Sequence, residues 1–134
     1  MIAYENIKII YGCEGYYVHD VDGGGITFET GPVESSVDVE HFIVENNLVE
    51  RCGGGIQLND GNGAYNFDTI SIRNNMVIDT GSGWTHNCFC TAGSIIIGSW
   101  GKVKAESITI ANNTMMGSTM SLLYLNEAEN VVLT

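Results

Sequence analysis

Three side chains in this sequence could carry out acid–base chemistry. Glu29 follows the apolar run ITF, Asp60 follows the run IQLN, and His86 lies within the long segment 81–105. Hydrolysis of a glycosidic bond uses two carboxyl groups, about 5 Å apart for retention and about 6.5–9.5 Å apart for inversion. We therefore interpret Glu29 and Asp60 as candidate catalytic carboxyls, and His86 as a candidate proton donor or partner of a carboxylate.

Amide and aromatic side chains accompany these three residues. Asparagine and glutamine amides match the vicinal hydroxyls of a sugar, and aromatic rings offer surfaces on which a sugar stacks. Glu34 and Asp38 are substitutes for the catalytic carboxyls, and the alternative for the whole set is an ordinary solvated acidic face. The candidate substrate-binding residues are Gln57, Asn59, Tyr65, Trp84, Trp100 and Asn126.

One short pattern, an acid followed by a polar or aromatic residue and then apolar–x–apolar, occurs five times. It reads ENIKI at 5–9, EHFIV at 40–44, DTISI at 68–72, ESITI at 106–110 and ENVVL at 129–133. A period of two predicts strands, and a fixed pattern at variable intervals predicts stacked repeats whose length changes lie in loops. We expect two core rows, Ile7–Phe42–Ile70–Ile108–Val131 and Ile9–Val44–Ile72–Ile110–Leu133.

Paired asparagines follow three of these strands, at positions 46–47, 74–75 and 112–113. A tight corner needs a residue near the left-handed region, which asparagine tolerates, and its amide can bond the equivalent residue one repeat away. The pairs therefore predict an asparagine ladder rather than a catalytic site. Glu45 and Arg73 occupy equivalent positions and predict a surface ion pair, and His41 is expected in a surface turn.

Runs of glycine precede a second short strand in two repeats, in GGGITF at 23–28 and GGGIQL at 53–58, and a serine precedes it, less regularly, in SLLYL at 121–125. Neither run is followed by the lysine or the helix that gives a phosphate-binding loop its anion site, so the glycines indicate sharp corners. In the third repeat either Trp84 or the pair Ile95 and Ile97 enters the core. We favour the isoleucines, because tryptophan would overfill a layer that holds isoleucine elsewhere.

These repeats resemble the right-handed parallel β-helix repeat of the pectate-lyase-like superfamily. The resemblance implies an all-β fold, a right-handed parallel β-helix (solenoid) of about four to five rungs, forming one domain or fragment over residues 1–134. Longer loops at 30–39, 60–67 and about 81–105 would form a wall along one face.

The resemblance implies a carbohydrate-active protein, a glycoside hydrolase-like segment that binds a neutral polysaccharide in a groove along the outer strand face. A polysaccharide lyase is disfavoured, because the repeat accounts for Arg51 and Arg73 as surface residues. The motifs of polygalacturonases and alginate epimerases are absent. The alternative is a non-catalytic β-solenoid segment that is carbohydrate-binding, tailspike-like or structural.

The charge balance limits the partners. With 16 acidic and 5 basic residues the chain has a formal net charge of −11, so it lacks the basic surface that nucleic acid requires. The sequence shows neither a membrane span nor a signal peptide, and we expect an extracellular or cell-surface location as part of a larger protein. We expect further rungs of a parent chain, or an oligomer, to cover the open ends.

No cofactor is expected from the sequence. His19, Asp20 and Asp22 carry ligand atoms that suit Ca²⁺, but their spacing matches no calcium-loop motif. The four cysteines, Cys13, Cys52, Cys88 and Cys90, form no C-x-x-C pair, and we expect small buried thiols.

Overall fold

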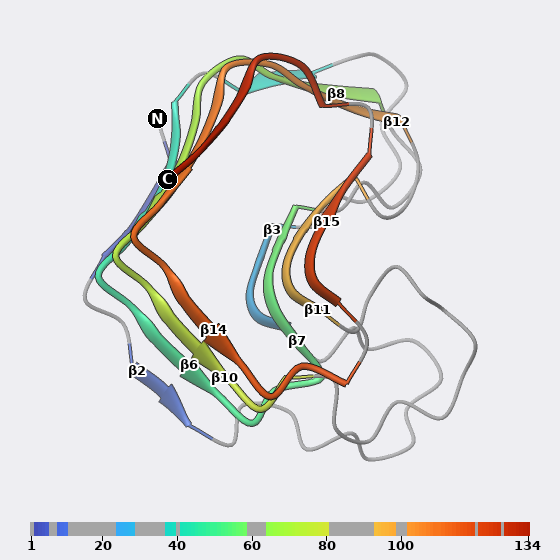
Figure 1. Cartoon of the computed structure of the whole chain (residues 1–134). Helices are drawn as coiled ribbons and strands as arrows, with labels where there is room; N and C mark the ends of the chain where they lie inside the picture. The colour runs from blue at the N-terminus through green and yellow to red at the C-terminus, as the bar shows by residue number, and fades with distance from the viewer. Residues whose placement is uncertain are drawn as a thin grey trace.

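The computed structural model describes residues 2–5, 8–10, 24–28, 37–39, 41–58, 64–80, 93–98, 102–119, 121–126 and 128–134. These residues form sixteen β-strands and no helix, and therefore no helix that could cross a membrane. All the strand pairs between them are parallel, which confirms the expected all-β class (Figure 1).

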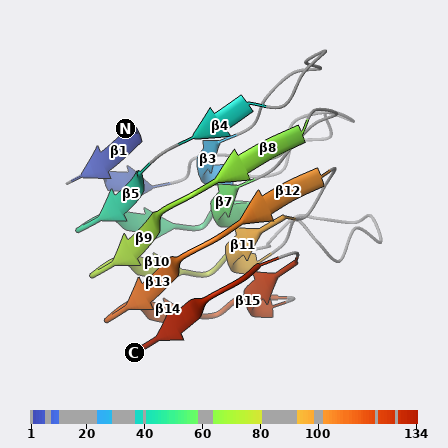
Figure 2. The ribbon, with the colours of Figure 1, turned by 90° about the horizontal axis from the view of Figure 1, so that it is seen from above.

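The strands belong to four sheets, and the chain visits the sheets in turn. Strand β1 pairs with β5, β2 with β6, β3 with β7 and β4 with β8. We call one passage through all four sheets a circuit, and Figure 2 shows the circuits lying one beside the next.

The bounds of the strands, sheet by sheet, are as follows. The first sheet holds β1 (Ile2–Glu5), β5 (Phe42–Glu45), β9 (Ile70–Arg73), β13 (Ile108–Ala111) and β16 (Val131–Leu133). The second holds β2 (Lys8–Ile10), β6 (Leu48–Glu50), β10 (Met76–Ile78) and β14 (Thr114–Met116). The third holds β3 (Gly24–Phe28), β7 (Gly54–Leu58), β11 (Gly93–Ile97) and β15 (Ser121–Leu125), and the fourth holds β4 (Val37–Val39), β8 (Ala64–Phe67) and β12 (Lys102–Ala105).

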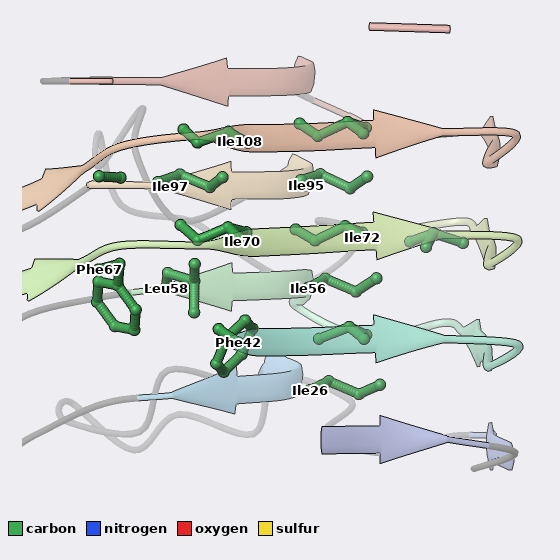
Figure 3. Close-up of a cluster of buried hydrophobic side chains, with 14 of the residues drawn as sticks. Ile26, Phe42, Ile56, Leu58, Phe67, Ile70, Ile72, Ile95, Ile97 and Ile108 are labelled. Carbon is green, nitrogen blue, oxygen red and sulfur yellow. The ribbon is translucent and has the colours of Figure 1, made fainter. Parts of the chain in front are cut away.

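The core consists of rows of apolar side chains that run across equivalent strands, as Figure 3 shows. Alternate residues of a strand point to opposite faces, so one row takes the first and another the third residue of each strand in the first sheet. The expected rows are confirmed from the second circuit onward, as Phe42–Ile70–Ile108–Val131 and Val44–Ile72–Ile110–Leu133.

The expected first members of these rows, Ile7 and Ile9, were wrong. Ile2 pairs with Phe42 and Tyr4 pairs with Val44, whereas Ile9 pairs with Val49 in the second sheet. In the first repeat the acid of the pattern is Glu5, the last residue of β1, so the strand that follows it is β2 of the second sheet. In the later repeats the strand that follows the acid belongs to the first sheet. The register of the first repeat therefore shifts by one strand.

The fourth sheet was not expected from the sequence. Its strands β4, β8 and β12 fall inside the segments 30–39, 60–67 and 81–105, which were expected to be loops, and β11 also lies within the last of these. The sheet contributes to the core, because the Phe67 ring of β8 meets the Phe42 ring of β5 edge to face, with centroids 5.9 Å apart. A parallel bridge between Ala105 and Ala128 continues this sheet into the next circuit.

A glycine is required where the second and third sheets meet. A side chain at Gly55 would overlap the carbonyl oxygen of Ser94 in the next circuit and the side chain of Val77. Two backbones therefore approach closely at this corner, as the glycine run predicted. Cys52, just before the run, has a fully buried side chain, as expected for a small residue at this corner.

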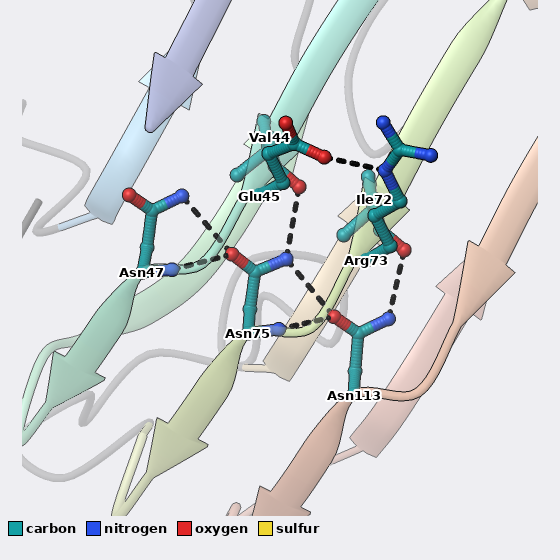
Figure 4. Close-up of polar contacts among 7 residues, drawn as sticks. All are labelled: Val44, Glu45, Asn47, Ile72, Arg73, Asn75 and Asn113. Carbon is teal, nitrogen blue, oxygen red and sulfur yellow. Dashed lines mark hydrogen bonds and ion pairs between the residues drawn. The ribbon is translucent and has the colours of Figure 1, made fainter. Parts of the chain in front are cut away.

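The two asparagines of each pair have different roles at the corner between the first and second sheets. The first members, Asn46, Asn74 and Asn112, adopt the left-handed conformation with φ of 59°, 56° and 54°. The second members, Asn47, Asn75 and Asn113, form the asparagine ladder (Figure 4). The prediction of a structural ladder is confirmed.

Asn75 makes hydrogen bonds in both directions along the ladder. Its side-chain oxygen accepts from the backbone N–H of Asn47 at 3.1 Å and from the Asn47 amide at 3.0 Å. Its own amide donates to the carbonyl of Val44 at 3.0 Å and to the side-chain oxygen of Asn113 at 2.9 Å. Buried polar groups must find partners, and at this bend the ladder supplies them.

The two surface predictions near this corner are also confirmed. Arg73 Nε donates to Glu45 Oε2, which joins adjacent circuits on the outer surface (Figure 4). An exposed pair of this kind contributes less than about 1 kcal/mol. His41 is exposed and has φ of 57°, so it occupies a surface turn.

The division of roles within each asparagine pair is testable by substitution. Asn75→Ala should lower the free energy of unfolding by about 3 kcal/mol, because it leaves buried groups of Asn47 and Val44 without partners. Asn74→Gly is the matched control and should cost less than about 1 kcal/mol, because glycine accepts a positive φ. Urea denaturation measures both changes, and equal losses would contradict the assignment.

Candidate functional site

The third sheet positions most of the candidate site, so its register is decisive. Ile56 pairs with Ile95 and Leu58 pairs with Ile97, and all four side chains are fully buried. The isoleucine register favoured from the sequence is therefore confirmed for the third circuit.

Two residues that directly follow strands of the third sheet, Gly98 and Asn126, lie in adjacent circuits. The N–H of Gly98 donates to the Leu58 carbonyl and the N–H of Asn126 donates to the Ile97 carbonyl, each at 3.0 Å, which continues the ladder by one residue. Phe28 pairs with Leu58, and positions 29 and 59, which follow these two residues in the sequence, lie outside the described part of the chain. We use the name strand-end row for the four sequence positions 29, 59, 98 and 126.

The third member of the strand-end row, Gly98, carries no side chain. Its φ is 77°, and a Cβ there would come within 2.6 Å of the Asn126 carbonyl oxygen. Asn126 is exposed, and its amide donates to the Gly98 carbonyl at 3.2 Å. The exposed Asn126 amide is thus already held against the neighbouring circuit, which fixes its orientation.

Gly98 was not among the residues singled out from the sequence. The four aligned segments read ITFE, IQLN, IIIG and LYLN, ending at positions 29, 59, 98 and 126. Their common apolar–x–apolar pattern is the signal that identifies the row once Ile95 is placed in the core.

Gln57 was expected in an outward-facing row beneath a wall of loops. Its equivalents in the next two circuits are Ile96 and Tyr124. Gln57 is 0% exposed and Ile96 is 1% exposed, whereas Tyr124 is partly exposed. The outward face of β7 and β11 is therefore covered, and Gln57 does not line an open surface in this structure.

Most of the other candidate residues lie outside the residues that the structure describes. These are Glu29, Asn59, Asp60, Trp84, His86 and Trp100, together with Glu34 and the cluster His19, Asp20 and Asp22. Tyr65 and Asp38 are described by their backbones alone: Tyr65 pairs with Val37 and Val103 in the fourth sheet, and Asp38 pairs with Asn66. The catalytic assignments thus stay predictions.

Within the described ranges, no three histidine, cysteine, aspartate or glutamate side chains lie close enough to hold a metal ion. The described part of the site offers amide groups and backbone carbonyls, which are suited to hydrogen bonding with neutral hydroxyls. It brings together Gly98 and Asn126, and it places Tyr65 in another sheet.

The chain matches no model of a known protein family, no curated protein and no solved structure.

Gln57 provides a test of whether its amide serves the fold or a ligand. A glutamine with no exposed surface needs hydrogen-bond partners within the protein. Gln57→Met, which keeps the length but removes the polar atoms, should lower the free energy of unfolding by about 1–3 kcal/mol. The measurement is thermal and urea unfolding in the absence of any ligand.

Tyr124→Phe is the matched control, because Tyr124 occupies the same row but is partly exposed. This variant should unfold within about 0.5 kcal/mol of the unchanged chain. An unaltered stability for Gln57→Met would show that the buried amide contributes nothing to the fold.

Proposed function

We propose that the chain is a right-handed parallel β-helix segment of the pectate-lyase-like type. Support comes from the pairing of each strand from β1 to β11 with the strand four positions later, since parallel strands joined by crossover connections almost always form right-handed crossovers. The stacked core rows and the ladder of Asn47, Asn75 and Asn113 are consistent with this architecture.

We further propose that the protein binds a neutral polysaccharide along the strand-end row. The observation that carries this proposal is the register of the third sheet, which places the exposed Asn126 directly beside Gly98 of the preceding circuit. Neighbouring positions in such a row lie about 4.8 Å apart, so their polar groups could form hydrogen bonds with successive parts of an extended polymer. The net charge of −11 favours a neutral polymer over an anionic one.

In the enzymatic form of the proposal, Glu29 and Asp60 flank the glycosidic bond. Two residues that are one rung and one position apart in a stacked repeat have backbones roughly 6 Å apart by strand spacing, and this is the separation we expect for Glu29 and Asp60. This separation suits a pair consisting of a general acid and either a nucleophile or a base. His86 would hold one carboxylate or donate a proton, and Trp84, Trp100 and Tyr65 would stack on sugar rings.

A non-catalytic carbohydrate-binding or structural module is the second candidate. The observation that favours it is the complete burial of Gln57 and Ile96, which removes the middle of the outward face of the third sheet from contact with a polymer. A ligand would then contact the strand-end row alone. In this form the protein contributes binding, and the chemistry takes place elsewhere. Both forms fit a protein that acts outside the cell or on its surface.

The two candidates differ in what two carboxylate substitutions do. If the protein is a glycosidase, Glu29→Gln and Asp60→Asn should each lower turnover of a neutral polysaccharide by at least about 100-fold, because each removes a group that transfers a proton or attacks carbon. Binding, measured by isothermal titration, should change far less. A glycan array identifies the polysaccharide first.

Glu129→Gln and Asp68→Asn are the matched controls. Both side chains are exposed and lie outside the third sheet, so the same chemical changes there should leave turnover and binding unaltered. Binding that persists with no turnover in the unchanged protein would establish the non-catalytic module. Equal turnover in the two site variants and the two controls would show that neither Glu29 nor Asp60 is a catalytic residue.

A further inference from the structure

The corner between the first and second sheets carries different surface side chains in successive circuits. The first asparagine of each pair is exposed there, and the residue two positions later begins a strand of the second sheet. These beginning residues pair with one another in the order Leu48–Met76–Thr114. Of the three, Thr114 alone carries a hydroxyl group, so residues 112–114 read Asn–Asn–Thr.

This tripeptide matches the acceptor sequence of N-linked glycosylation, which is an asparagine, any residue except proline, and then a serine or threonine. Asn112 is the only asparagine in the sequence with a serine or threonine two positions later. A motif this short also occurs by chance, so its structural context decides what it means. An attached oligosaccharide is bulky and hydrophilic, and the asparagine that carries it must therefore lie at the surface.

The hydrogen bonds of the asparagine ladder involve the middle residue of the tripeptide and not the acceptor side chain. The side-chain oxygen of Asn113 accepts from the Asn75 amide at 2.9 Å, and the Asn113 amide donates to the Ile72 carbonyl at 2.8 Å. Asn112 and Thr114, on either side of Asn113, are both exposed. An oligosaccharide on the Asn112 side chain would therefore leave the ladder intact.

The surface around the tripeptide is also accessible. Met76, which pairs with Thr114 in the neighbouring strand, is 44% exposed, and Met116, two residues further along the same face of β14, is 49% exposed. Asn112 has φ of 54°, so the chain turns at the acceptor residue itself. Figure 1 shows the start of β14 on the opposite side of the circuit from β15, and an oligosaccharide at this corner would therefore leave Asn126 accessible.

We propose that Asn112 is a site of N-linked glycosylation, with an oligosaccharide carried on a lipid pyrophosphate as the donor. The amide nitrogen of Asn112 attacks the anomeric carbon of the first sugar and loses a proton to a base of the transferring enzyme. The bond between that carbon and the pyrophosphate oxygen breaks, and the lipid pyrophosphate leaves. The Thr114 hydroxyl is the group that identifies the acceptor. The proposal rests on the extracellular location proposed above and does not depend on polysaccharide binding.

The experiment produces the whole chain behind a secretion signal in eukaryotic cells that attach N-linked oligosaccharides. Mass spectrometry of secreted and cell-retained chain, before and after treatment with peptide N-glycosidase, locates any oligosaccharide. Thr114→Val removes the hydroxyl and keeps the shape of an exposed side chain, so the fold should be unaffected. Met76→Thr is the matched positive control, because it gives Asn74 the same tripeptide at the same corner one circuit away.

The unchanged chain should carry an oligosaccharide on Asn112 that the glycosidase removes, leaving an aspartate there. Thr114→Val should lose this oligosaccharide, and Met76→Thr should gain a second one on Asn74. An unmodified Asn112 in the unchanged chain would overturn the proposal, most sharply if Asn74 is modified in Met76→Thr. An oligosaccharide that persists in Thr114→Val would also overturn it. Polysaccharide binding should be equal in the unchanged chain and Thr114→Val, and its absence from both would contradict the proposed function alone.

Discussion

The rest of the structure depends on the hydrogen bonds of three asparagine side chains, in successive circuits, at the corner between the first two sheets. A strand that turns sharply removes backbone groups from the ladders on either side, and these groups are buried. Asn75 replaces the missing partners in three directions, toward Asn47, Val44 and Asn113. A carboxamide does this because it both donates and accepts, whereas a carboxylate or a hydroxyl could not supply all four bonds.

This corner fixes the register of all four sheets. A slip of one residue would move an asparagine out of the ladder and would also turn a buried row such as Phe42–Ile70–Ile108 toward solvent. Because the register is fixed, the third-sheet strands stay aligned, and the residues Gly98 and Asn126 that follow two of them line up between adjacent circuits, whatever the length of the connections. Differences in those connections can thus change a binding surface without changing the core, and this is the physical basis for placing the proposed site there.

The sequence predicted the parallel strands, the core rows from Phe42 onward and the asparagine ladder, because each rests on a local pattern repeated at least three times. It misplaced the first circuit, because the acid–polar–apolar pattern around Ile7 precedes a strand of the second sheet, not the first. The correct alignment of the first repeat is indicated instead by the dipeptide Glu–Asn, which occurs in YEN at 4–6 and in VEN at 44–46. The fourth sheet was missed because its strands, VDV, AYNF and KVKA, share no repeated pattern of the kind that identifies the first sheet. The burial of Gln57 depends on what covers its row, which no local pattern encodes.

The most direct test of the central claim compares the side-chain amide protons of neighbouring asparagines by NMR. If the ladder sets the register, the Asn75 amide protons exchange slowly with water and show cross-relaxation to Asn113 and to the strand that contains Val44. The amide protons of Asn74, which is exposed, exchange at the rate of a free carboxamide. Equal exchange rates at Asn74 and Asn75, with no contact between Asn75 and Asn113, would contradict the account.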